Sequence, residues 1–106
     1  MNTVSLSFAA ENLPNLDTFT RTDGIVVLYK QSGNSWHKIG RTEVIMDNLN
    51  PVWIKSFDVQ YHFEQRENYK IEIYDIDDKN DLDNFAKHDF VGTVNFAIHE
   101  VVTARD

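Results

Sequence analysis

Residues 69–96 read YKIEIYDIDDKNDLDNFAKHDFVGTVNF, and this stretch decides the fold. Tyr69, Ile71 and Ile73 alternate with charged residues, which is the period-two pattern of a strand with one buried face. A second apolar run covers 90–96, and the residues between the two runs, 75–89, include six aspartates. The stretch therefore predicts two strands joined by a loop of high negative charge.

Aspartates crowded into one loop repel one another, so either their pKa values rise or a bound cation supplies the missing charge. Only Lys79 and Lys87 oppose the six aspartates, so the loop contributes −4 of the chain's formal net charge of −7. Several carboxylate oxygens without a cysteine thiolate favour calcium over zinc or copper. The loop is therefore a candidate calcium site.

The chain has 106 residues, which is enough for one domain with one core. Its acidity argues against nucleic acid as a partner. It has no cysteine, which excludes a disulfide framework and a thiol nucleophile and fits a reducing, cytoplasmic compartment. No apolar run approaches the roughly 18 residues of a transmembrane helix, and no Ser/His/Asp pattern indicates catalysis. We therefore expect a non-catalytic domain without a transmembrane segment.

The remaining apolar runs also have the lengths and patterns of short strands. Six strands are predicted in all, at 4–8, 25–29, 36–42, 57–61, 69–73 and 90–96, with one helical turn at 98–103. Short strands separated by loops predict an all-β, antiparallel β-sandwich in which the loops collect at two ends.

Strand parity predicts which loops meet. Because successive strands run in opposite directions, the loops after the first, third and fifth strands should emerge at the same end. The loop after the first strand contains Asp17 and Asp23, and the acidic loop follows the fifth strand. We therefore expect Asp17 and Asp23 to lie near Asp75, Asp77 and Asp89.

The chain resembles a known family in the motifs around these loops. Loop one, LPNLDTFTRTDGIV at 13–26, carries two aspartates six positions apart, and the acidic loop supplies Asp75-x-Asp77 and then DFVG at 89–92. Together with GRTE at 40–43, LNPVW at 49–53 and YHFE at 61–64, these motifs resemble the calcium-dependent phospholipid-binding C2 domain, and within it the copines. The resemblance covers nearly the whole chain.

The resemblance implies that residues 1–106 form a single C2-like domain, a Greek-key sandwich that has eight strands in the family. The six strands found here are two fewer. The chain is then either a portion of a longer protein, or a sandwich whose unpaired edges and apolar surface make it marginal alone. The pair Asp23-Gly24 also replaces the family's usual Asp-Pro, which removes a fixed φ before the second strand.

The resemblance also implies a ligand set of carboxylates and backbone carbonyls for two or three calcium ions. The carboxylates are Asp17, Asp23, Asp75, Asp77 and Asp89, with Asp83 as the alternative to Asp89, and the carbonyls are those of Leu16 and Ile76. His88 stands next to Asp89, and a protonated imidazole there would compete with calcium for the carboxylate.

The function that the resemblance implies is calcium-dependent binding to acidic phospholipid membranes. The domain would be cytoplasmic and would be recruited to the inner face of a membrane when calcium rises. Phe19, Leu82 and Phe85 lie at loop tips, where they either insert among the headgroups or pack locally within their loops. The alternative function is a calcium-independent protein–protein interaction domain.

Overall fold

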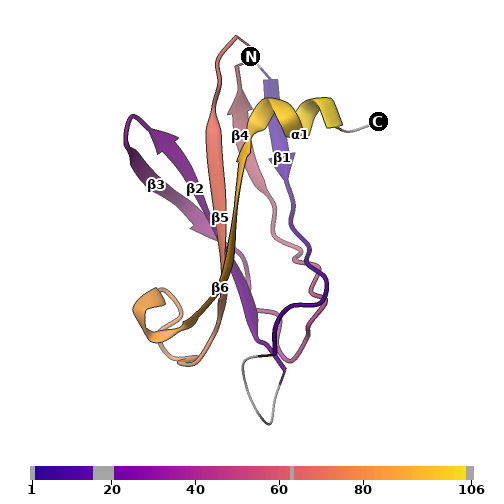
Figure 1. Cartoon of the computed structure of the whole chain (residues 1–106), viewed down its shortest axis with the longest axis vertical. Coiled ribbons are helices and arrows are strands. Elements are labelled where there is room, and N and C mark those ends of the chain that lie inside the picture. The colour runs from indigo at the N-terminus through magenta and orange to yellow at the C-terminus, as the bar shows by residue number, and fades with distance from the viewer. Residues whose placement is uncertain (1, 16–20, 63, 105–106) are drawn as a thin grey trace.

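The structure is a computed structural model and describes residues 2–15, 21–62 and 64–104. Its six strands form two antiparallel sheets (Figure 1). The first sheet pairs β1 (Asn2–Leu6) with β4 (Phe57–Tyr61). The second has the order β3-β2-β5-β6, and its strands are β2 (Gly24–Ser32), β3 (Ser35–Arg41), β5 (Asn68–Asp75) and β6 (Asp89–Ala97).

The predicted all-β fold and the six predicted strands are confirmed, although most of the strands begin or end one to three residues from the predicted bounds. The helical turn is also present as α1 (Ile98–Ala104), which lies across the end of the molecule where β6 finishes. A short 3-10 helix, η1 (Phe85–Lys87), precedes β6. Alternating apolar and polar residues predicted β1, β4 and β5, whereas a continuous β-branched and aromatic run predicted β2.

The core lies between the two sheets and is closed by α1. Its members share low exposure and come from both sheets and the helix: Leu6, Leu28, Phe57, Val59, Tyr69 and Ile98. Ile25 to Leu28 are all fully buried, so both faces of this part of β2 are covered. A strand buried on both faces has little freedom to shift register, because a shift would move apolar side chains out of the core. β2 is therefore a fixed support for the residues that precede it.

Gly24 joins the start of β2 to a tryptophan from the segment before β4. A Cβ atom at Gly24 would lie 3.2 Å from the Trp53 ring. The Trp53 indole Nε1–H donates a hydrogen bond to the Gly24 carbonyl at 3.1 Å. Glycine in place of the family's proline therefore lets the buried indole pack directly on the backbone next to Asp23.

Three loops meet at one end of the sheets, as strand parity predicts. Gly24 and Ile45 exchange both backbone hydrogen bonds, at 2.9 and 3.0 Å. The Ile76 N–H donates to the Asp23 carbonyl at 2.9 Å, which joins the acidic loop to the segment before β2. We call this end, formed by residues 21–24, 45–50 and 75–89, the crown.

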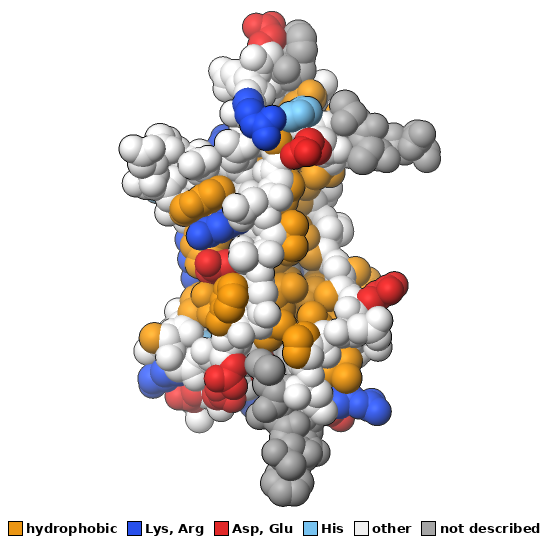
Figure 2. Space-filling view, in the orientation of Figure 1, with side chains coloured by type: hydrophobic (Ala, Val, Ile, Leu, Met, Phe, Trp, Pro, Cys, Tyr) orange, Lys and Arg blue, Asp and Glu red, His pale blue; other side chains and the backbone are white. Residues whose placement is uncertain are grey.

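An apolar groove of about 250 Å³ lies between the two sheets on one side of the sandwich. Leu6 and Phe8, at and after the end of β1, and Val94 and Phe96 of β6 line it. Figure 2 shows hydrophobic side chains in a band between the sheets on this face. The groove matches the exposed apolar surface expected for a sandwich with six strands. That the chain is marginally stable alone stays a prediction.

Far from the crown, a buried carboxylate holds the start of β5. Glu67 is 7% exposed. Its two oxygens accept hydrogen bonds from the Lys30 Nζ and from the His62 backbone N–H, each at 3.0 Å. Burial by itself raises the pKa of Glu67, but the His62 N–H and the Lys30 and His62 side chains outweigh it and lower the pKa below 4.5.

This lowered pKa predicts an acid-sensitive contribution to stability. A group whose folded pKa is below its unfolded value stabilises the protein above the unfolded pKa and loses that effect as pH falls through the folded pKa. The free energy of unfolding of the wild type should therefore exceed that of Glu67→Gln at pH 6, and the difference should shrink as pH falls below about 4.5. Urea denaturation between pH 3 and pH 7 measures this.

Glu64→Gln is the matched control for that experiment, because Glu64 is exposed and its substitution removes the same charge. Its denaturation midpoints should follow those of the wild type across the pH range. A constant difference between wild type and Glu67→Gln at every pH would show that the Glu67 contacts do not depend on ionisation.

Candidate functional site

Three aspartates stand at neighbouring strand ends in the crown. Asp23 immediately precedes β2, Asp75 ends β5 and Asp89 begins β6. In the sheet, Gly24 is the register partner of Asp75, and Asp75 is the register partner of Asp89. Because β2, β5 and β6 are adjacent in that order, the backbone places the three residues side by side along one sheet end.

Asp75 and Asp23 are joined by a buried hydrogen bond. Asp75 is fully buried, and its Oδ1 accepts the backbone N–H of Asp23 at 3.0 Å. Asp23 is also buried, and its Oδ1 accepts the backbone N–H of Asp47 at 2.7 Å. A carboxylate that accepts backbone N–H groups is held in one orientation. These two side chains therefore tie the acidic loop, the start of β2 and the β3–β4 loop together.

Basic side chains of the chain itself pair with several acidic residues of the crown. Lys87 Nζ lies 3.0 Å from Asp81 Oδ2 and 3.4 Å from Asp78 Oδ2. The hydrogen bond from Lys87 lowers the pKa of Asp81, and in return Asp81 raises the pKa of Lys87. Lys79 Nζ lies 3.7 Å from Asp23 Oδ2. Much of the negative charge predicted for this loop is therefore balanced locally.

Asp83 faces the β3 side of the crown. Its Oδ1 accepts a hydrogen bond from Arg41 Nε and lies 4.0 Å from Lys38 Nζ. The Arg41 hydrogen bond lowers the pKa of Asp83. Asp89, in contrast, is the register partner of Asp75. Of the two alternatives for the last carboxylate, the backbone therefore places Asp89 beside Asp75, whereas Asp83 pairs with β3.

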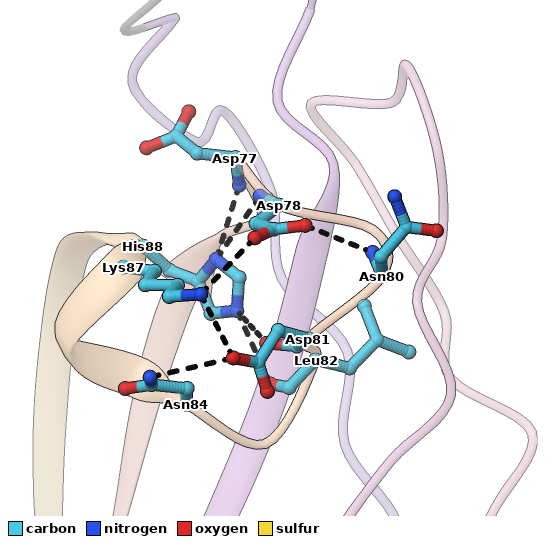
Figure 3. A network of polar contacts seen from close by, with 8 residues as sticks. All are labelled: Asp77, Asp78, Asn80, Asp81, Leu82, Asn84, Lys87 and His88. Carbon is cyan, nitrogen blue, oxygen red and sulfur yellow. Dashed lines mark hydrogen bonds and ion pairs between the residues drawn. The ribbon is translucent and has the colours of Figure 1, made fainter.

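His88 organises the acidic loop from inside. Its imidazole is buried, and Nδ1 accepts the backbone N–H of Asp77 at 3.1 Å and lies 3.5 Å from the backbone nitrogen of Asp78 (Figure 3). On the other side of the ring, Nε2 lies 3.1 Å from the Asp81 carbonyl and 3.2 Å from the Leu82 carbonyl. These partners require the neutral tautomer with hydrogen on Nε2. The polar contacts of the ring are thus with backbone atoms of the acidic loop. The contact expected from the sequence is a different one, in which a protonated imidazole competes with calcium for the Asp89 carboxylate.

Figure 3 shows the direction of the Asp77 side chain. The carboxylate of Asp77 points away from Lys87 and Asp81, while its backbone N–H points at His88. Asp77 is exposed. The imidazole therefore fixes the backbone at Asp77 while leaving the carboxylate at the surface of the crown.

The aromatic residue predicted at the tip of the acidic loop packs on the sheet. The Phe85 ring is half-buried, with its centroid 5.0 Å from that of Tyr74 and 6.0 Å from that of His88. Lys38 Nζ lies over the ring, 4.6 Å from its centroid. This geometry is the local-packing alternative for Phe85. Leu82 is also half-buried.

The remaining predicted residues are placed as follows. Ile76 is buried and donates its N–H to the Asp23 carbonyl. Leu16, Asp17 and Phe19 lie outside the described residues. Within the ranges that the structure describes, no three His, Cys, Asp or Glu side chains gather closely enough to hold a metal ion. The described part of the crown therefore places Asp23, Asp75 and Asp89 at neighbouring strand ends, which is less than a complete metal cluster.

Sequence reasoning missed two features of the crown. Met46, in the β3–β4 loop, is 54% exposed beside Asp47. Strand parity places this loop at the crown, so the sequence could have indicated Met46 as an exposed apolar residue there. Lys79 was counted only as part of the loop's net charge. Its contact with Asp23 joins residues 56 positions apart in the chain, and no local pattern indicates such a contact.

Comparison with known proteins identifies the family. The family model of the C2 domain matches residues 6–106. The chain belongs to the C2 domain family. This C2 domain is 36% identical over 106 residues to Protein BONZAI 1 of Arabidopsis thaliana and 34% identical over 107 residues to Copine-E of Dictyostelium discoideum. Each match covers 94% of this chain, but the chain spans only 18% and 17% of those relatives. The resemblance to a copine-type C2 domain is therefore confirmed.

Solved structures show the same fold. BON1-C2B superposes with a TM-score of 0.72 at 23% identity, over 95% of this chain and 67% of that chain. A calcium-bound structure of two C2 domains of Extended-Synaptotagmin 2 gives a TM-score of 0.67 at 23% identity, over 97% of this chain and 36% of that chain. The described part of this chain has no helix that is both long and apolar enough to cross a membrane.

The His88 contacts predict a positioning role that can be measured. In His88→Ala the backbone N–H of Asp77 loses its acceptor, which should lower the free energy of unfolding by about 1–3 kcal/mol. Hydrogen exchange at the Asp77 and Asp78 amides should accelerate more than in the strands. Chemical denaturation and amide exchange measured by NMR test both effects.

His37→Ala is the matched control, because His37 is exposed on β3. It should leave the exchange of the Asp77 amide unchanged. In the wild type, the ¹⁵N chemical shifts of the imidazole should report hydrogen on Nε2 and none on Nδ1. The opposite tautomer would contradict the proposed role of His88.

Proposed function

We propose that this C2 domain binds acidic phospholipid membranes in a calcium-dependent manner through its crown. The observation that carries the proposal is the alignment of Asp23, Asp75 and Asp89 on adjacent strand ends, with Asp75 holding the backbone of Asp23. The proposed set is completed by Asp77, by Asp17 and by carbonyl oxygens of Leu16 and Ile76. Asp17 and Leu16 lie outside the described residues.

The chemistry of this donor set fits calcium. All the proposed ligands are carboxylate or carbonyl oxygens, a set that calcium prefers. Zinc and copper sites generally include nitrogen or sulfur ligands. The ammonium group of Lys79 already lies next to Asp23 Oδ2, as a stand-in for a cation at that carboxylate. The calcium-bound state of Extended-Synaptotagmin 2 supports the proposal at the level of fold.

Bound calcium would supply positive charge that lets the phosphate of an acidic lipid approach the crown. The residues of the chain hold the loops of the crown in position. Asp75 fixes the Asp23 backbone, and Asp23 fixes Asp47 in the next loop. The β3–β4 loop then carries exposed Met46 at the same end, where it can add an apolar contact with the headgroup region. Phe19 and Leu82 stay candidates for that contact, whereas Phe85 is held against Tyr74.

The localisation follows from the same proposal. The domain would be cytoplasmic and would move to the inner face of a membrane when calcium rises. The module would target a protein to the membrane rather than catalyse a reaction. A calcium-independent protein-interaction domain is the second candidate, and it is favoured by the pairing of Asp78, Asp81 and Asp83 with basic side chains of the chain itself.

The decisive experiment measures binding to vesicles. The chain should co-sediment with vesicles of phosphatidylserine and phosphatidylcholine in calcium, and chelator should release it. The double variant Asp75→Asn, Asp77→Asn should lose at least about tenfold in calcium-dependent binding, because two charges of the proposed site are removed. Calcium at a hundredfold excess over its dissociation constant should also stabilise the wild type by about 2.7 kcal/mol.

The matched control is Asp58→Asn, Glu64→Gln, which removes the same charge from exposed positions on or near β4. It should bind vesicles like the wild type. Asp89→Asn, at an exposed position, tests the site without changing the buried Asp75 and should also weaken binding. No vesicle binding in calcium would favour the calcium-independent protein-interaction domain. Vesicle binding that survives chelator and all the aspartate variants would contradict the proposed calcium dependence.

A further inference from the structure

One basic side chain of the crown touches a proposed calcium ligand. Lys79 leaves the acidic loop between β5 and β6 and places its Nζ 3.7 Å from Asp23 Oδ2. The Asp23 side chain is 12% exposed and that of Lys79 is 55% exposed. The ammonium therefore reaches in from solvent to a largely buried carboxylate.

The other oxygen of Asp23 is already engaged. Asp23 Oδ1 accepts the Asp47 N–H at 2.7 Å, so this bond fixes how the carboxylate is turned. Oδ2 is then the oxygen that faces the Lys79 ammonium. Any further cation that binds Asp23 through Oδ2 must share that oxygen with Lys79 or move the ammonium away.

The neighbouring basic residues have different partners. Lys87 pairs with Asp78 and Asp81. Arg41 and Lys38 pair with Asp83. In the ligand set proposed above, the backbone favours Asp89 over Asp83, and Asp78 and Asp81 are not members. Among the ion pairs in the described part of the crown, the Lys79 pair is thus the one in which an ammonium lies on a proposed ligand.

We propose that Lys79 is a tethered counterion that occupies the cation position at Asp23 and sets the calcium affinity of the crown by competition. This inference rests on the proposed function. In the metal-free state the ammonium offsets repulsion between Asp23 and the neighbouring carboxylates. Calcium must displace it, because two cations within a few ångströms of one oxygen repel each other.

Displacement has a second consequence for charge. The lysine side chain is long and flexible, so once it leaves Asp23 its ammonium is free to turn outward from the crown. Calcium binding would then add its own charge and expose that of Lys79 on the same surface. The size of the competition is limited, because an ion pair with one exposed partner is screened by solvent.

The test is calcium affinity measured by isothermal titration calorimetry with calcium chloride alone. Lys79→Gln removes the competing charge and should bind calcium about three- to fivefold more tightly than the wild type, which corresponds to the upper range for such a pair. Lys79→Arg keeps the charge and should stay close to the wild type. Lys87→Gln is the matched control: it makes the same charge change in the same loop and should alter affinity by less than about twofold.

A spectroscopic readout follows the lysine itself. In ¹³C-dimethylated protein, the NMR signal of Lys79 should shift on addition of calcium chloride, and the signal of Lys55 should stay in place. Lys55 is exposed and its Nζ lies over the Phe57 ring, which is not part of the crown. Magnesium chloride at the same concentration reports general salt effects.

The outcomes separate this inference from the proposed function. If the wild type binds calcium and Lys79→Gln binds no more tightly than Lys87→Gln, then Lys79 does not compete and the calcium site stands without it. If Lys79→Gln binds calcium and the wild type does not, the competition is supported in its strongest form. If neither binds calcium, the proposed function fails and the tethered counterion fails with it.

Discussion

The hydrogen bond from the Asp23 N–H to the buried Asp75 carboxylate is the contact on which the crown depends. Burying a carboxylate is unfavourable unless hydrogen bonds compensate for the lost water. The sheet register supplies such a bond to Asp75 Oδ1 by placing Asp75 opposite Gly24, next to the Asp23 amide. The same residue that carries a proposed metal ligand therefore also fixes the chain entering β2. Loss of the Asp75 oxygen would disturb both roles at once.

The acidic loop is stabilised in two ways: by ion pairs at its surface and by a buried imidazole inside it. Lysine and arginine side chains pair with Asp78, Asp81 and Asp83 at its surface, and exposed pairs of this kind contribute little energy each. The buried imidazole of His88 holds the backbone by bonding N–H groups on one side and carbonyls on the other. His88 thus holds the loop backbone at Asp77, Asp81 and Leu82, and charge balance depends on exposed ion pairs that salt screens.

The prediction of the fold from sequence succeeded where local patterns carry the information. Alternation at Tyr69, Ile71 and Ile73 reflects a sheet with one buried face, and strand parity alone brought Asp23 and Asp75 to the same end. The site was harder to predict because its partners are distant in sequence. Lys79 meets Asp23 and Arg41 meets Asp83 only after the sheet has formed. No spacing rule indicates such pairs. The sequence alone also leaves the choice between Asp83 and Asp89 open, because the loop is long and holds several aspartates.

The edges of the two sheets differ in a way that bears on the open groove. The outer edge strand β3 carries Lys38 and Arg41, and charged side chains on an edge oppose pairing with another strand. β1 has no charged residue, and β6 has only Asp89 at its first position. These two strands flank the apolar groove, where Leu6 and Val94 contribute to the lining. In the described part of the sandwich, charged residues therefore oppose pairing with another strand at β3. Along the groove, β1 and β6 carry almost no charge that would oppose such pairing.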